Sequence, residues 1–402
     1  MRHVSNEERR QRLGLRHRLA DRVTTVEEAA RAMVGLHSSD PATVYLSARA
    51  RVSGMKQDDL EAALYDQRTV VRILGMRRTM FVVPVELAPL LHFSSTVALM
   101  AAERRRLVRM VEDAGIARDG EAWVDDTTKR TLSALRARDE AVATDLTKDV
   151  PELGEKITFY KKDGSVSATV GMSTRVLFLL AAEGKIVRGR PKGSWVSSLY
   201  RWAPMEQWVG RPLEEMTRPE AQAELLRLWL AAFGPGTELD MKWWTGWPVT
   251  QVRAALAAIG AVEVEVESGP AYLLPGDLDP VAPPPHWVSL LPGLDPTTMG
   301  WKEREWYLGP HAPRLFDRNG NAGQTVWVNG RVVGGWGQRA TGEIVWDLLE
   351  DVGAEVVDEI GRHAEDLRLW IGDRVVIPRF RSPMDAELGE LQGRRSTEGD
   401  DA

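Results

Sequence analysis

The sequence contains no cysteine, so disulfide bonds, thiolate nucleophiles, cysteine zinc fingers and iron–sulfur clusters are excluded. Its seven histidines include no short-spaced pair of the kind that binds a metal ion. No apolar run approaches the roughly 18 residues that a membrane-spanning helix needs, and the basic N-terminus lacks the apolar core of a signal peptide. We therefore expect a cytoplasmic protein with no metal, no cofactor and no membrane partner.

The charge is unevenly placed along the 402 residues, of which 43% are hydrophobic and 27% are charged. This composition is typical of a folded protein, and the length predicts roughly two to four domains. Residues 1–210 hold 34 Lys and Arg against 27 Asp and Glu, a net +7, whereas residues 211–402 hold 18 against 31, a net −13. A basic half indicates a surface for nucleic acid or another polyanion. The alternative is an evenly solvated surface.

The N-terminal residues predict a set of helices followed by a β-hairpin. Residues 6–19 are expected to form an exposed basic helix. Thr24 or Thr25 is expected to cap the next helix, and Asp40 with Pro41 supplies the N-cap and first position of a third. A further helix is expected over residues 57–65, and the β-branched stretch TVVRILGMRRTMFVVP reads as a hairpin.

The same order recurs twice, which indicates tandem winged-helix domains, since its irregular spacing differs from the fixed period of a solenoid. The second copy has helices near residues 127–137 and 143–149, an insertion around TFYKKDGS, and an apolar helix capped by Ser173 and Thr174. Its hairpin, KIVRGRPKGSWVSSLYRWAP, should turn near residues 191–194. The third copy contains AQAELLRLWLAAF, ELDMKWW, VTQVRAALAAI and the hairpin VEVEVESGPAYLLP.

After the Pro-rich linker DPVAPPPHW the pattern becomes mainly β, interrupted by one acidic helix near residues 355–370. The Asn329-Gly330 pair predicts a tight hairpin, and DRVVIPRF reads as a late strand. The fold class expected is therefore α+β, with three tandem winged-helix domains followed by a C-terminal β-barrel. The expected domains are residues 1–118, 119–210 and 211–278 for the winged helices, 286–384 for the barrel, and 385–402 for a disordered tail.

The segment His37-Ser38-Ser39-Asp40-Pro41 is the densest group of polar side chains beside apolar residues. As a functional site, His37 would accept a proton from water or bind a flipped base, and the Asp40 carboxylate would stabilise positive charge. As a structural element, Asp40 caps its helix, the serines bond the backbone and His37 packs. The pattern alone favours the structural interpretation.

Other motifs are less specific. Lys185, Arg188, Arg190 and Lys192 cluster around one predicted turn, and a wing of this composition can follow phosphates; solvated turn charge is the alternative. Trp243, Trp244 and Trp247 could stack on bases but lie in an apolar helix, which favours core packing. Residues 317–321 resemble a calcium loop only loosely, which favours a plain turn.

Four segments together give the chain a family resemblance. VGLHSSDP, VVRILGMRRTMFVV, KWWTGW and LLPGLDPTTMGWKEREWYLG before FDRNGNAG resemble the AlkZ-like winged-helix proteins, over about residues 10–382. Characterised members are bacterial glycosylases that excise bulky alkylated bases and unhook interstrand crosslinks, and some protect producers of DNA-alkylating antibiotics. The resemblance implies three winged-helix units and a β-barrel that form a C-shaped clamp with a basic channel.

The chain departs from the family pattern at the catalytic loop. Where the family has Gln-x-Gln or Gln-x-Asp, this chain has His37 and Ser39, and Arg77-Arg78-Thr79 stands where the glycosylases tend to have Arg-Gly-Thr. The resemblance implies that His37 positions or activates water, Ser39 bonds the water or a phosphate, and Asp40 stabilises the sugar cation. Expected contacts to DNA are Arg49, Arg51, Arg77, Arg78, Lys185, Arg188, Arg190 and Lys192.

Three functions therefore stay open. The first is a monofunctional glycosylase for alkylated or crosslinked purines, acting as a monomer on damaged double-stranded DNA at the nucleoid. The second is a non-catalytic DNA binder, such as a lesion sensor, a drug-sequestering protein or a transcriptional regulator. A regulator would normally dimerise on a palindrome, and no heptad pattern for a dimer helix is present. The third is a scaffold that binds a protein through the acidic C-terminal half.

Overall fold

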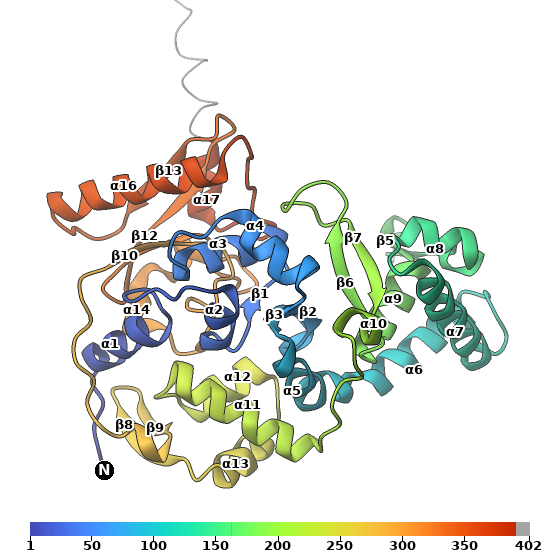
Figure 1. Cartoon of the computed structure of the whole chain (residues 1–402), viewed down its shortest axis with the longest axis horizontal. Coiled ribbons are helices and arrows are strands. Elements are labelled where there is room, and N and C mark those ends of the chain that lie inside the picture. The colour runs from blue at the N-terminus through green and yellow to red at the C-terminus, as the bar shows by residue number, and fades with distance from the viewer. Residues whose placement is uncertain (162, 391–402) are drawn as a thin grey trace, which may run out of the picture. The chain divides into compact units, whose positions relative to one another are not determined.

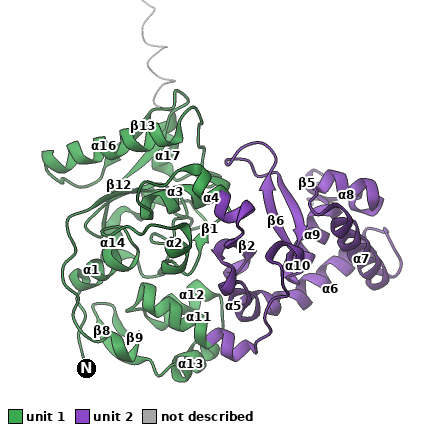
Figure 2. Cartoon of the chain, in the orientation of Figure 1, with its two compact units in different colours: residues 1–61, 223–402 green, residues 62–222 purple. Residues whose placement is uncertain are grey.

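A computed structural model describes residues 1–161 and 163–390 (Figure 1). The chain divides into two compact units (Figure 2): Met1–Glu61 with Ala223–Ala402 form unit 1, and Ala62–Gln222 form unit 2. Unit 1 therefore combines the N-terminal residues with the C-terminal half of the sequence. The expected boundaries of the winged-helix domains, and their number, stay predictions.

The first helix of unit 1, α1 (Asn6–Arg16), begins where Ser5 Oγ accepts a hydrogen bond from the backbone N–H of Glu8. The expectation of an exposed basic helix is wrong, because the side chains of Arg9 and Arg12 are only 3% and 1% exposed. Arg12 bonds to Glu8 within the helix and to Asp277, which follows more than 260 residues later. Carboxylates from distant parts of the chain thus allow the arginines of α1 to be buried.

Two further helices begin as the sequence predicts. Thr25 and Glu28 form a reciprocal capping box at the start of α2 (Val26–Ala32). Asp40 is the N-cap of α3 (Pro41–Arg51), with Pro41 in the first turn. The next helix, α4 (Gln57–Glu61), is short. Because α3 is buried along almost its whole length, it forms a rigid base for the residues that precede it.

The third predicted copy is confirmed as helices and a hairpin. It contains α11 (Arg218–Phe233), α12 (Glu238–Thr245), α13 (Val249–Ala258), and the antiparallel pair β8 (Val262–Val266) and β9 (Gly269–Leu273). Trp244 and Trp247 are 6% and 4% exposed. The ring of Trp244 lies 6.2 Å from those of both Trp229 and Phe233. These tryptophans therefore belong to the core and are not a base-stacking surface.

The C-terminal residues form an open antiparallel sheet in the order β10 (Val288–Leu291), β11 (Thr325–Val328), β12 (Arg331–Gln338), β13 (Ile344–Leu348). The Asn329-Gly330 turn is confirmed, with positive φ at both residues. A closed barrel is not confirmed, since the described residues contain no pairing between β10 and β13. Helix α16 (Ala354–Ile371), which the sequence predicts, packs against both of these edge strands.

Helix α17 (Pro383–Glu390) packs against β12 through glycines. A Cβ atom at Gly335 would lie 2.5 Å from Met384 Sδ, so this strand must lack side chains there. Residues 385–390 are therefore helical where a disordered tail was expected, and the rest of that expectation lies outside the described residues. The late strand expected in DRVVIPRF is wrong, because residues 373–380 form neither helix nor strand.

Unit 2 opens with the predicted hairpin, β2 (Val70–Leu74) paired with β3 (Met80–Pro84). Its core is built mainly from α6 (Val97–Asp113), α7 (Gly120–Arg138), α8 (Ala143–Asp149) and α9 (Met172–Ala182). A second predicted hairpin, β6 (Ile186–Pro191) with β7 (Tyr200–Pro204), is confirmed. Unit 2 also contains α5 (Ala88–Leu91), α10 (Met205–Val209), β4 (Lys156–Tyr160) and β5 (Val166–Gly171).

Two features of unit 2 differ from expectation. The insertion around TFYKKDGS is the hairpin of β4 and β5, and α9 starts at Met172 without a side-chain cap from Ser173 or Thr174. The helical stretch Val85–Asp113 is long and apolar enough to cross a membrane by length and composition, and 44% of its most apolar part is buried. A helix in a protein core passes the same test, and α6 packs on α7 and α9.

Candidate functional site

Asp40 joins the start of α3 to the C-terminal segment of unit 1. Its Oδ1 accepts a hydrogen bond from the backbone N–H of Ala42 at 3.0 Å, and its Oδ2 accepts one from the backbone N–H of Arg379 at 2.7 Å. The side chain is 6% exposed. The structural interpretation of Asp40 as a helix cap is therefore confirmed. The same bonds hold a carboxylate in one orientation at the positive end of a helix.

His37 ends the short strand β1 (Leu36–His37) and is 7% exposed. The backbone N–H of Ser39 lies 3.5 Å from His37 Nδ1, at the outer limit of a hydrogen bond. A neutral imidazole that accepts through Nδ1 carries its proton on Nε2. In this tautomer Nε2 is a hydrogen-bond donor, and the ring can take up a proton only at Nδ1.

The buried ion pair between Arg51, the last residue of α3, and Asp295 fixes the position of this helix. The Arg51 guanidinium donates to both carboxylate oxygens at 2.9 and 2.7 Å, and Ser47 Oγ donates to Asp295 Oδ2 at 2.6 Å. Burial would raise the pKa of Asp295, but the charge of Arg51 and hydrogen bonds from Arg51 and Ser47 hold it below its usual range. Thr43 Oγ1 adds a bond to the carbonyl of Gly293 at 2.8 Å.

This ion pair removes Arg51 from the expected contacts to DNA. Its side chain is 0% exposed and its guanidinium is occupied by Asp295, Ser47 and Thr297. The sequence places Arg51 two residues after Arg49 on one basic helix. A two-residue step on a helix turns the side chain by about 200°, so the two arginines face opposite sides of α3.

On the other side of α3, Arg49 lies beside a second cation. Its guanidinium stands 5.7 Å from the ring of Trp370 on α16. Burial, followed by the positive charge of Arg22, lowers the pKa of Arg49 to about 10, while Asp366 opposes this shift. Within the described residues neither guanidinium group donates a hydrogen bond. Arg22, Arg49 and Trp370, here called the α3 cationic cluster, therefore present donors for an anion next to an aromatic ring.

A second cationic cluster lies in unit 2. Arg78 follows β2, pairs with Glu103 on α6 at 2.9 Å and lies 5.2 Å over the ring of Phe178. Burial, then the charges of Arg106 and Arg78, lower the pKa of Arg175 on α9, and Glu103 opposes them. Arg175 therefore interacts electrostatically with the cations Arg78 and Arg106 and with the carboxylate of Glu103. Arg77, the neighbouring residue, is exposed with a positive φ of 53°.

The expected wing cations of β6 and β7 are mostly paired. Lys185 bonds to Glu183 at 2.7 Å and Arg190 to Asp66 at 2.8 Å. Arg188 lies 5.2 Å over the ring of Tyr200 and 5.3 Å over that of Trp202, and Lys192 is exposed at the start of the connecting loop. Since exposed ion pairs contribute only about 0–1 kcal/mol, a phosphate can displace these carboxylates.

The sequence matches the model of the family described as "DNA glycosylase AlkZ-like" over residues 30–370. This range includes His37 to Asp40 and the β2–β3 and β6–β7 hairpins. The chain belongs to the AlkZ-like DNA glycosylase family. A solved structure, the Streptomyces sahachiroi DNA glycosylase AlkZ, is similar with a TM-score of 0.70 and 20% sequence identity, covering 94% of this chain and 100% of that chain. No curated protein matches.

Family membership confirms the resemblance inferred from the sequence, and the structural likeness shows that the fold is shared. This AlkZ-like chain is accordingly a DNA repair glycosylase by family. Among the described residues no group of histidine, aspartate and glutamate side chains could hold a metal ion. The turn at Asp317, whose Oδ1 accepts from the backbone N–H groups of Asn319 and Asn321, is the plain turn that the sequence favours.

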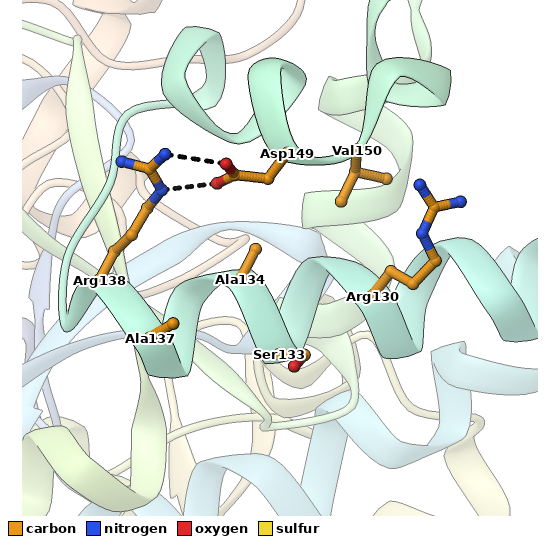
Figure 3. Close-up of a pocket in the computed structure, with 7 residues that line it drawn as sticks. All are labelled: Arg130, Ser133, Ala134, Ala137, Arg138, Asp149 and Val150. Carbon is orange, nitrogen blue, oxygen red and sulfur yellow. Dashed lines mark hydrogen bonds and ion pairs between the residues drawn. The ribbon is translucent and has the colours of Figure 1, made fainter.

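One surface hollow of the AlkZ-like chain lies away from the residues above. It has a volume of about 460 Å³ between α7 and the end of α8 in unit 2 (Figure 3). Figure 3 shows the guanidinium of Arg138 facing the carboxylate of Asp149, and Arg130 is held by Asp126 and Glu152. Carboxylates neutralise both arginines, so this hollow does not present them to an anion.

Sequence reasoning missed Arg22, Trp370, Arg106 and Arg175 as site residues. Arg22 lies 27 residues before Arg49 in the sequence, and Trp370 lies 321 residues after it. No local sequence pattern indicates that the three side chains come together. Arg106 belongs to a basic run on α6, which was a usable signal. Arg175 is a lone cation in an apolar helix, and only the folded structure reveals that the charges of Arg78 and Arg106 act on it.

Proposed function

We propose that the protein is a monofunctional DNA glycosylase that hydrolyses the N-glycosidic bond of a bulky N-alkylated or crosslinked purine. The observation that carries the proposal is the fixed Asp40 carboxylate beside His37 in a chain of this family. Two backbone N–H groups orient Asp40, so its charge is in place before the reaction. A preorganised charge of this kind stabilises the positive sugar that develops as the base leaves.

His37 acts on the water in this proposal. With its proton on Nε2 it donates to the water oxygen and holds the water against the sugar. The water oxygen bonds to C1′ of the sugar cation as the C1′–N bond to the base breaks, and the resulting oxonium loses its proton to bulk water. Ser39, half-buried two residues later, bonds the same water or an adjacent phosphate. An alkylated purine already carries positive charge as a leaving group, so its departure needs little acid catalysis.

The proposed DNA surface in unit 1 is the α3 cationic cluster. Arg49 follows Asp40 by nine residues on one rigid helix, about 13 Å along its axis. A backbone phosphate held by Arg22 and Arg49 would therefore fix the strand at a set distance from Asp40. In unit 2 we propose contacts from Arg77, Arg78, Arg106 and Arg175, with Lys185, Arg188, Arg190 and Lys192 on the β6–β7 hairpin.

A non-catalytic DNA binder is the second candidate. Two observations favour it. This chain has a histidine where the family has glutamine, and the backbone N–H of Ser39 contacts His37 Nδ1, the atom that would have to accept a proton. A lesion sensor, a drug-sequestering protein or a regulator would keep the cationic clusters and need no activated water. We expect the protein to act as a monomer on damaged double-stranded DNA, in the cytoplasm at the nucleoid, in either case.

Single-turnover release of 7-methylguanine from a duplex with one lesion tests the proposal. The variants are His37→Ala and Asp40→Asn, since asparagine caps a helix as well as aspartate while removing the charge. We expect each to slow release by roughly 10²-fold or more with duplex binding retained. Tight binding without release by the wild type, on this duplex and on a crosslinked one, would favour the non-catalytic binder.

A further inference from the structure

The segment between α16 and α17, residues 373–382, forms neither helix nor strand, yet hydrogen bonds hold it in place. The side-chain oxygen of Gln338 on β12 accepts from the backbone N–H of Val376 at 2.7 Å. Ser382 Oγ accepts from the backbone N–H of Asp385 at 3.2 Å, at the start of α17. Residues between these two attachments therefore have defined positions although they belong to no regular element.

Arg379 lies between these attachments and is joined to the candidate catalytic carboxylate through its backbone. Its N–H donates to Asp40 Oδ2 at 2.7 Å. Because an N–Cα bond is about 1.5 Å long, the Cα atom of Arg379 lies within roughly 4 Å of that oxygen. The Asp40 side chain is 6% exposed, whereas that of Arg379 is exposed. An arginine that solvent and substrate can reach therefore begins beside the carboxylate.

The guanidinium of Arg379 is not occupied by the protein. Within the described residues it forms no ion pair and donates no hydrogen bond, and it stands 5.8 Å from the ring of Phe380. Asp40 does not pair with it, because both carboxylate oxygens accept backbone N–H groups. The neighbouring Arg381, by contrast, donates to Asp385 Oδ2 at 2.8 Å. Arg379 can therefore bind an anion without first breaking an ion pair.

The other charged residues of the segment lie farther along the chain from this point. Asp373 and Arg374 are exposed, and they precede the attachment at Val376. They are adjacent and of opposite charge, so they add little net charge to the surface. In this segment, Arg379 is accordingly the unpaired cation whose backbone contacts Asp40.

A substrate brings negative charge to the same place. The sugar of a damaged nucleotide that lies against Asp40 has a phosphate on its 5′ side and another on its 3′ side. A phosphate and a carboxylate repel each other, and the repulsion is stronger at a buried carboxylate than in bulk water. The charge that would stabilise the sugar cation therefore also opposes the approach of the DNA strand.

We propose that Arg379 binds a phosphate next to the damaged nucleotide and offsets its repulsion from Asp40. This inference rests on the proposed function, because it requires the reacting sugar to lie at Asp40. The planar guanidinium suits two parallel hydrogen bonds to phosphate oxygens. Arg49 lies near the other end of α3, so Arg379 holds the lesion itself while the α3 cationic cluster holds a more distant part of the strand.

The test compares the wild type and Arg379→Met in single-turnover release of 7-methylguanine at saturating protein. One duplex has all its phosphates, and in two others the phosphate on the 5′ or the 3′ side of the lesion is a neutral methylphosphonate. On the first duplex we expect the variant to be at least about tenfold slower, because it loses charge-assisted hydrogen bonds. On one methylphosphonate duplex the two rates should agree within about twofold, since the attraction and the repulsion are both absent.

Two further variants serve as controls. Arg379→Lys keeps the positive charge and should retain more of the rate than Arg379→Met. Arg374→Met is the matched control, exposed in the same segment without a bond to Asp40, and should match the wild type on all three duplexes. Each variant should melt close to the wild type, because the substitutions are at exposed positions and leave the backbone N–H of Arg379 on Asp40.

Base release by the wild type, with equal rates for Arg379→Met on the first duplex or the same ratio of rates on all three, would overturn the inference and leave the proposed function intact. Affinities for the three duplexes, measured by fluorescence anisotropy, give a readout that needs no base release. If the wild type releases no base, the proposed function fails. A ratio of affinities that falls to about one on a single methylphosphonate duplex would then still support the phosphate contact, and an unchanged ratio would overturn it.

Discussion

The Asp40 carboxylate accepts the backbone N–H of Arg379 across 339 positions of sequence. Its other oxygen caps α3 at Ala42. One side chain therefore performs two structural tasks at the place where the family resemblance locates catalysis. Loss of the side chain and loss of its charge are consequently different perturbations, and comparing them separates stability from chemistry.

Asp40→Ala should lower the free energy of unfolding by about 1–3 kcal/mol, because it removes the helix cap and leaves the N–H of Arg379 without its acceptor. Asp40→Asn keeps an acceptor for the cap and should cost less. Urea unfolding of both variants measures the difference. Equal stability of Asp40→Ala and the wild type would contradict the two hydrogen bonds.

Arg51→Met should lower the free energy of unfolding by about 3–5 kcal/mol, because it leaves the Asp295 carboxylate buried without its counter-ion. The double variant Arg51→Met, Asp295→Asn should lose less than the sum of the two single variants. Urea unfolding of the four proteins completes the cycle. Additive losses would show that the pair is not coupled.

The same pair shows what the sequence can and cannot predict. Helix α3 follows from local signals, since Asp40 and Pro41 mark its start and need no knowledge of the fold. Whether the side chain of Arg51 is buried or exposed depends on Asp295, which lies 244 residues later in the sequence. Its buried carboxylate packs against the helix and pairs with the Arg51 guanidinium. Identical arginines two residues apart thus have opposite environments, and only tertiary packing distinguishes them.

The C-terminal sheet gives a second example. Alternation and the Asn329-Gly330 turn predict its central strands, because both are properties of neighbouring residues. Closure into a barrel is a property of the two edge strands, and here α16 packs against those edges. The glycines of β12 indicated a close approach, but the sequence does not reveal that α17 and Met384 are the partners.

Removal of the α3 cationic cluster should weaken DNA binding without changing the fold. Arg49→Met and Arg22→Met should each reduce affinity for all duplexes and reduce the slope of log affinity against log salt by about 1. Fluorescence anisotropy between low and moderate salt measures both quantities. Arg227→Met, at an exposed pair with Glu224, is the matched control and should leave the slope unchanged.

An affinity that does not depend on salt in the wild type would argue against phosphate contacts as a whole. A slope that is unchanged in Arg49→Met but smaller in Arg175→Met would place the contacts in unit 2 alone. The double variant Arg188→Ala, Arg190→Ala should also weaken binding to all duplexes alike. In that variant, loss of ring contacts at Tyr200 and Tyr65 requires a check of stability.

The buried His17 should make stability depend on pH. Burial, with the charge of Arg51, lowers the pKa of His17 to about 3, and its Nδ1 lies 2.9 Å from Thr297 Oγ1. The unfolded chain takes up this proton near pH 6.5, whereas the folded chain does not until about pH 3. The unfolded state therefore binds more protons in that range, and stability is lost as the pH falls through it.

For this single group the loss between pH 7 and pH 5 should be about 2 kcal/mol, since each pH unit contributes about 1.4 kcal/mol once the unfolded histidine is protonated. Urea unfolding at several pH values measures it in the wild type and in His17→Gln. In the variant, the free energy of unfolding should depend less steeply on pH, because about one proton fewer is taken up on unfolding. His92, whose pKa burial lowers to about 4, contributes in the same direction, so some slope should remain in His17→Gln. Equal slopes in both proteins would mean that His17 is protonated in the folded state.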